Sequence, residues 1–62
     1  MDYNVLKNYI ASKGLSIYQV EKSAGLGNGT ISKWEHGRTS PTLASLERVA
    51  EVLEINVTDL LM

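Results

Sequence analysis

Glycine and proline interrupt this 62-residue chain at short intervals, and the segments between them have the apolar spacing of helices. Apolar residues recur three and four positions apart, which is the period of one helix face and not of a strand. The chain contains no internal repeat, low-complexity tract or linker. The pattern predicts an all-α fold of five short helices in one domain that spans residues 1–62.

Local capping signals mark where the helices begin. The segment Ser16-Ile17-Tyr18-Gln19 is a capping box, in which a serine hydroxyl and a glutamine side chain satisfy backbone N–H groups reciprocally. Asp2, Thr42 and Asn56 are expected N-caps of the first, fourth and fifth helices. The third helix is expected over residues 28–36, joined to the second by a glycine-rich turn. Two short helices so joined are typical of a helix-turn-helix.

Composition excludes several classes of function. The chain has no cysteine, so it has no disulfide and no thiolate metal site, and its single histidine, His36, lacks the neighbours that zinc requires. We find no paired catalytic carboxylates, nucleophile motif or phosphate-binding loop, and we expect no enzyme, no cofactor and no small-molecule ligand. No apolar run is long enough for a membrane span. A soluble, cytoplasmic protein is expected.

Charge is informative mainly through its distribution. The net charge of −1 is weak support for nucleic-acid binding. Lysine and arginine outnumber acidic residues within residues 1–40, whereas acidic residues outnumber basic ones within 41–62. If residues 1–40 face DNA, residues 41–62 form an acidic rear face, and an ordinary solvated surface would show the same mild asymmetry.

The order and spacing of several short segments are more specific than any one of them. These segments are Lys13-Gly14-Leu15-Ser16, Ala24-Gly25-Leu26, Thr30-Ile31-Ser32-Lys33-Trp34-Glu35, Gly37, Pro41, Ala50-Glu51-Val52-Leu53 and Asp59-Leu60-Leu61. Together they resemble the helix-turn-helix domain of the phage repressor and Cro family over residues 6–61. The resemblance implies a compact, lambda-repressor-like domain that regulates transcription. In such domains the third helix lies in the DNA major groove and the second crosses above it.

The same resemblance implies which residues read bases. They are Asn28, Gly29, Ser32 and Lys33. Lysine can donate to guanine O6 and N7, and asparagine can pair with adenine through two hydrogen bonds. Alternative roles remain open: Asn28 as a helix cap, Lys33 as a solvated charge, Ser32 as a phosphate contact and Gly29 as a residue that reads nothing.

Phosphate contacts are expected on both sides of these residues. Ser16, Tyr18 and Thr30 lie near helix starts, and Arg38, Thr39 and Ser40 follow the third helix. For Ser16 the capping role alone is a sufficient explanation, and residues 38–40 could equally form a plain surface loop. Trp34, at helical spacing from Ile31, is expected in the core.

Four positions depart from the family's usual residues. Ile17 stands where the family has a phosphate-binding glutamine, and Glu21 stands where it has a small alanine. Ile10 replaces an arginine that pairs with Glu35, and Glu54 replaces a glycine or asparagine.

Apolar residues crowd the end of the chain: Ile55, Val57, Leu60, Leu61 and Met62. A core this small does not readily bury all five, and exposed apolar patches mark interfaces. Domains of the family that this chain resembles dimerise through this region, so the resemblance and the patch together imply a homodimer through these residues, on a near-palindromic site with half-sites about 34–36 Å apart. The alternative is a monomer with a frayed tail.

Two functions remain. The first is a sequence-specific DNA-binding regulator, either a repressor or a Cro-like protein. The second is a protein-interaction module, such as an antitoxin or anti-repressor, that keeps the fold with little DNA binding. The acidic rear, Gly29 and the missing glutamine favour the second.

Overall fold

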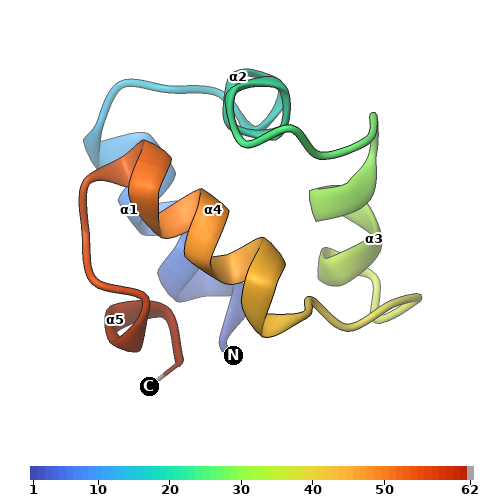
Figure 1. The fold of residues 1–62 in the computed structure, drawn as a ribbon. Helices are drawn as coiled ribbons and strands as arrows, with labels where there is room; N and C mark the ends of the chain where they lie inside the picture. The colour runs from blue at the N-terminus through green and yellow to red at the C-terminus, as the bar shows by residue number, and fades with distance from the viewer. Residues whose placement is uncertain (62) are drawn as a thin grey trace.

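The computed structural model describes residues 1–61, and this part of the chain forms five helices and no strand. The helices are α1 (Tyr3–Ser12), α2 (Ile17–Ser23), α3 (Thr30–Glu35), α4 (Leu43–Leu53) and α5 (Thr58–Leu61) (Figure 1). The all-α prediction is confirmed. Across residues 1–61, the helices are too short and too polar to cross a membrane.

The helix starts are fixed by the side chains that the sequence indicates. The Asp2 carboxylate accepts the Asn4 N–H at 2.9 Å. Ser16 and Gln19 form the complete capping box, with distances of 3.1 Å to the serine hydroxyl and 2.8 Å to the glutamine oxygen. The Thr42 hydroxyl accepts the Ser45 N–H at 3.1 Å. These caps satisfy N–H groups that have no partner within a helix.

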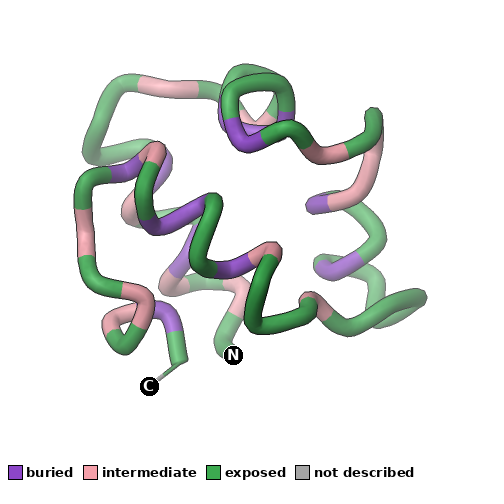
Figure 2. The backbone as a smooth tube through the Cα atoms, in the orientation of Figure 1, coloured by how far each residue is buried: buried purple, intermediate pink, exposed green. Residues whose placement is uncertain are grey.

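Helix α4 runs through the middle of the molecule, and α2 contacts α1, α3 and α4 (Figure 1). The inward faces carry the buried residues (Figure 2). They are Leu6, Ile10, Val20, Ala24, Ile31, Trp34, Leu46, Val49, Ala50, Leu53 and Leu60. On α4 the apolar residues Leu46, Val49, Ala50 and Leu53 form one buried stripe, whereas Leu43 is 56% exposed.

Two helices begin later than the sequence suggests. Helix α3 starts at Thr30 because the preceding Gly29 has φ +80°, a left-handed conformation that interrupts a right-handed helix. Helix α5 starts at Thr58, and among residues 1–61 the Asn56 side chain makes no hydrogen bond to the helix start. Instead the backbone N–H of Asn56 donates to the Asp59 carboxylate at 3.2 Å.

Helix α4 ends on a non-glycine residue in the left-handed region. Glu54 has φ 57° and ψ 42°, and the N–H groups of Glu54 and Ile55 donate to the carbonyls of Glu51 and Ala50 at 3.2 and 3.0 Å. The end of α2 has the same pair of hydrogen bonds with Gly25 at the equivalent position. A side chain in this conformation is strained, and glycine is the usual solution.

The variant Glu54→Gly is therefore expected to raise the free energy of unfolding by roughly 0.5–1 kcal/mol, because relief of left-handed strain exceeds the added entropy of the unfolded chain. Urea denaturation followed by circular dichroism measures the change. The control is Glu47→Gly in the middle of α4, which should destabilise by about 1 kcal/mol. A lower stability for Glu54→Gly contradicts the strain argument.

Candidate nucleic-acid interface

Helices α2 and α3 lie at one edge of the molecule, joined by the turn over residues 24–29. In Figure 1, α2 is seen nearly end-on and α3 from the side, so the two helices cross. Val20 of α2, Ala24 directly after it, and Ile31 and Trp34 of α3 are buried in the common core. The core role predicted for Trp34 is confirmed. Because the inner faces are held by packing, the outer face of α3 has a fixed position.

The start of α3 is held by a carboxylate from α2. Glu21 is 4% exposed, and its two carboxylate oxygens accept backbone N–H groups of Gly29 at 3.3 Å and Ile31 at 2.8 Å. Gly29 is the N-cap residue and has no capping side chain. Glu21 thus supplies from ten residues away the acceptor that an N-cap side chain normally provides.

The outer face of α3 presents polar side chains. Asn28, Ser32 and Lys33 are all exposed. Ser32 and Lys33 are neighbours on α3, whereas Asn28 lies in the turn ahead of the helix, before the left-handed Gly29. Among the hydrogen bonds of residues 1–61, none involves the Asn28 side chain. The capping role left open for Asn28 is filled by Glu21, and the Asn28 amide is directed to solvent.

Gly29 and Thr30 have fewer groups free to bind DNA than the sequence suggests. The Gly29 N–H donates to Glu21, and its carbonyl accepts the Lys33 N–H at 3.0 Å. The Thr30 hydroxyl donates to the Gly27 carbonyl at 2.7 Å. Since phosphate oxygens only accept hydrogen bonds, this hydroxyl is not a free donor. Gly29 can contribute a close approach of backbone to DNA, but no base-reading side chain.

The remaining expected phosphate contacts lie on both sides of α3. Ser16 and Tyr18 are exposed at the start of α2, and the Ser16 hydroxyl still has its own proton to donate while accepting from Gln19. Arg38, Thr39 and Ser40 are exposed in the loop between α3 and α4. The structure therefore brings donors to the two ends of the helix-turn-helix.

Comparison with known proteins decides the family. A helix-turn-helix family model matches residues 6–60, which is nearly the whole chain. No match was found among curated proteins, and none among solved structures. The chain belongs to the helix-turn-helix family of phage repressor and Cro-type proteins. This is a family of DNA-binding transcription regulators.

The departures of this helix-turn-helix protein from its family have structural explanations. Ile17 is half-buried and packs against the core, so its position serves packing and not phosphate binding. Ile10 is buried in the core, where a charged arginine would be costly. Glu35 faces solvent, and its carboxylate lies 3.8 Å from Nε2 of His36. An exposed pair of this kind contributes little to stability.

Two further residues of the interface were missed by sequence reasoning. His36 follows α3 and is exposed, four residues after Ser32 and three after Lys33, so it extends the same face. The Lys22 amino group lies 6.0 Å from the centre of the Tyr18 ring, which adds a cation beside Tyr18. In both cases the signal available was the four-residue spacing along a helix.

Tyr3 carries a buried hydroxyl on the inner side of this region. Its Oη has no hydrogen-bond partner within residues 1–61. Burial raises the pKa of the Tyr3 phenol, and the nearby carboxylates of Glu35 and Glu21 raise it further. The neutral form is therefore favoured in the folded protein.

The variant Tyr3→Phe is expected to raise the free energy of unfolding by roughly 1 kcal/mol at neutral pH, because it removes an unpaired buried hydroxyl. The raised pKa of Tyr3 also makes stability depend on pH, because the folded protein holds the phenol proton more tightly than the unfolded chain does. This contribution to stability is complete below the pKa of the unfolded state, near 10, and is lost as the pH rises through the higher pKa of the folded state. Tyr3→Phe should show a smaller alkaline loss. Urea titrations at several pH values measure both effects, with Tyr18→Phe at an exposed tyrosine as control. Equal alkaline loss in the two variants contradicts the interpretation.

The apolar residues at the end of the chain divide into three groups. Leu60 is fully buried within the core of a single chain, which corrects its assignment to a dimer interface. Ile55 and Val57 are half-buried, and Leu61 is 47% exposed. Met62 lies outside the described residues. Surface for an interface therefore comes from Ile55, Val57 and Leu61.

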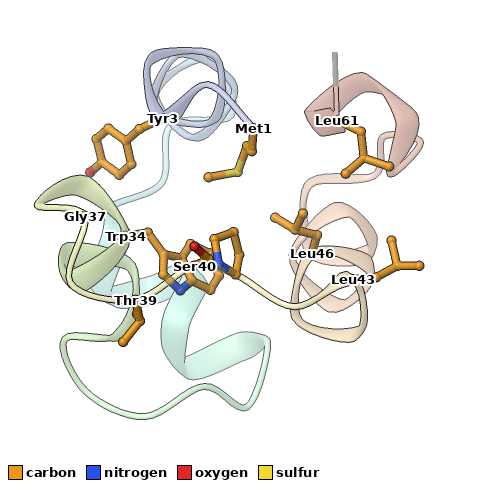
Figure 3. Close-up of a pocket in the computed structure, with 10 residues that line it drawn as sticks. Met1, Tyr3, Trp34, Gly37, Thr39, Ser40, Leu43, Leu46 and Leu61 are labelled. Atoms are coloured by element: carbon orange, nitrogen blue, oxygen red, sulfur yellow. The ribbon is translucent and has the colours of Figure 1, made fainter.

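Leu61 also borders a surface hollow of about 350 Å³ between the N-terminal segment, α4 and the loop after α3 (Figure 3). Met1 and Leu43, which are both exposed, also line it. Trp34 and Tyr3 form its inner side, and Thr39 and Ser40 lie at its edge. Exposed apolar side chains thus gather on the side of the molecule that carries α5.

Proposed function

We propose that the protein is a sequence-specific repressor or Cro-like regulator that places α3 in the major groove of an operator. The observation that carries this proposal is that Ser32 and Lys33 of α3 are exposed, as is Asn28 in the turn before it, while Ile31 and Trp34 hold the inner face of α3 in the core. A rigid helix with free polar side chains on one side is what base recognition in the major groove requires. Such a regulator acts on DNA in the cytoplasm.

Donors on either side of α3 support this orientation. Ser16 and Tyr18 at the start of α2, and Arg38 in the following loop, flank the base-reading face. Contacts to phosphates fix the register of a protein on the duplex, and base contacts then specify sequence. Lys22 adds a positive charge to this surface, and the exposed His36 adds a ring nitrogen. We assign the phosphate contacts to these residues, with Thr39 and Ser40 as neutral donors in the loop.

A homodimer is part of the proposal. Leu61, with the half-buried Ile55 and Val57, offers apolar area on the face beside α4. Two copies joined through this area would present two α3 helices to successive major grooves, about 34–36 Å apart. The operator is then an inverted repeat.

Selection of bound sequences from a random duplex library tests the proposal directly, at about 150 mM salt where weak phosphate contacts are partly suppressed. Enrichment of an inverted repeat is the expected result. A single enriched half-site would support base recognition but overturn the dimer. No enrichment by folded protein would overturn sequence-specific binding.

An interaction module that has lost DNA binding is the second candidate, favoured by the acidic rear and by Gly29, which has no side chain to read a base. Salt dependence separates the two. For a phosphate-binding protein, the logarithm of affinity falls with the logarithm of salt by about 0.9 per phosphate neutralised. A flat dependence, or no affinity at low salt, favours the interaction module.

A further inference from the structure

We propose that Glu21 is a positioning residue for DNA recognition: its buried carboxylate orients α3 and supplies the helix cap that the side chains of residues 28 and 29 do not. The inference rests on the proposed function. It concerns the position at which this chain departs from the small residue usual in its family.

The geometry of the carboxylate is that of a helix cap. Each oxygen of Glu21 accepts a backbone N–H at the start of α3, from Gly29 at 3.3 Å and from Ile31 at 2.8 Å. The positive end of the α3 dipole favours a negative charge at this place. In the described part of the chain, the one close contact between an acidic and a basic side chain is that of Glu35 and His36, so Glu21 is balanced by these N–H groups and not by a cation. Burial of a carboxylate is tolerated when its oxygens accept such bonds.

Helix α3 depends on this external cap because its own sequence lacks one. It has six residues, and a helix of this length is not stable alone. The N-cap residue is Gly29, which has no side chain, and Asn28 points to solvent one residue earlier. The two hydrogen bonds from Gly29 and Ile31 to Glu21 fix both the position of α3 and its direction relative to α2.

The cap also has a consequence for DNA. The N–H groups of Gly29 and Ile31 are already occupied, and a carboxylate beside them repels phosphate. The start of α3 is therefore closed to the DNA backbone, and the protein meets DNA through Ser32 and Lys33 of α3 and Asn28 in the turn before it. Glu21 should then support specific binding, which needs α3 in one place, and should not support non-specific binding, which depends on total charge.

The isosteric variant Glu21→Gln tests this inference. It keeps the side-chain volume, but it removes the charge and replaces one acceptor with a donor that faces an N–H. In the free protein, hydrogen exchange at the Gly29 and Ile31 amides should accelerate by about tenfold or more, as expected for the loss of a charge-assisted bond. On DNA, affinity for the selected operator should fall by about tenfold, while affinity for random DNA stays equal or rises slightly because a negative charge is lost.

The direction of the change separates positioning from simple electrostatics. If Glu21 acts only as a negative charge near DNA, Glu21→Gln strengthens binding to operator and random DNA alike, and the proposal is overturned. Unchanged exchange at Gly29 and Ile31 also overturns it. Glu47→Gln, an exposed glutamate on α4, is the matched control for charge and should leave amide exchange unchanged. If Glu21→Gln does not fold, both proteins are compared in the stabilised Glu54→Gly background.

The variant Asn28→Ala supplies the complementary result. Because Glu21 is the cap, Asn28→Ala should change the melting temperature by less than about 4 °C, the shift that corresponds to a small fraction of the stability of such a domain. Its operator affinity should fall by about fivefold or more, with random-DNA affinity unchanged. A large fall in melting temperature would show that Asn28 is the cap and would overturn the inference. If the wild-type protein binds no DNA, the proposed function fails as well, whereas normal wild-type binding with an unaffected Glu21→Gln variant refutes only the role of Glu21.

Discussion

The variant Leu60→Ala is expected to lose about 2–5 kcal/mol of stability, because it removes a fully buried side chain and leaves a cavity. A domain of this size is stable by only about 3–9 kcal/mol, so a large fraction of the variant should be unfolded at 37 °C. Urea denaturation followed by circular dichroism measures the loss. The loss should be the same at low and high protein concentration, since Leu60 lies in the core of one chain.

The neighbouring variant Leu61→Ala is the matched control. Leu61 is 47% exposed, so the same substitution should cost the single chain less than about 1 kcal/mol. Its effect should be seen instead in sedimentation equilibrium, as a weaker dimer. If Leu60→Ala is as stable as the wild type when the protein is dilute, Leu60 does not belong to the core. If Leu61→Ala leaves the association unchanged, the proposed interface is wrong.

Helix positions were predictable from the sequence where they depend on residues close together along the chain. The caps at Asp2, Ser16 and Thr42 each involve a partner two or three residues away, so the sequence contains the whole interaction. The buried faces follow from the helical period, which predicts Ile31 and Trp34 in the core. The family resemblance extends these local signals to the packing of the five helices.

The interactions that sequence reasoning missed join distant residues or oppose a local preference. Glu21 stands out in the sequence as a departure from a small residue, but its bonds to Gly29 and Ile31 exist only because α2 and α3 cross at that point. Leu60 and Leu61 are adjacent apolar residues on one short helix, and only the path of the chain after Glu54 decides which one faces the core.

The variant Lys33→Ala is expected to weaken operator binding by about 1–3 kcal/mol per half-site, or about 5- to 150-fold. Lys33 is exposed on the outer face of α3, beside Ser32 and one turn after Gly29, which leaves space for a long side chain to reach a base edge. Its amino group can donate to guanine O6 and N7, and alanine leaves these acceptors unpaired. Competition between operator and random duplexes at fixed salt measures the specific and non-specific affinities together.

The comparison between the two affinities decides what Lys33 does. A base-reading lysine contributes to the operator complex far more than to random DNA, so the ratio of the two affinities should fall. The control is Lys7→Ala on α1, an exposed lysine outside the helix-turn-helix, which should leave the ratio unchanged. If Lys33→Ala lowers both affinities equally, Lys33 contacts phosphate, and the salt dependence should then fall by about 0.9 for each copy bound. Base recognition by α3 would in that case depend on Asn28 and Ser32 alone.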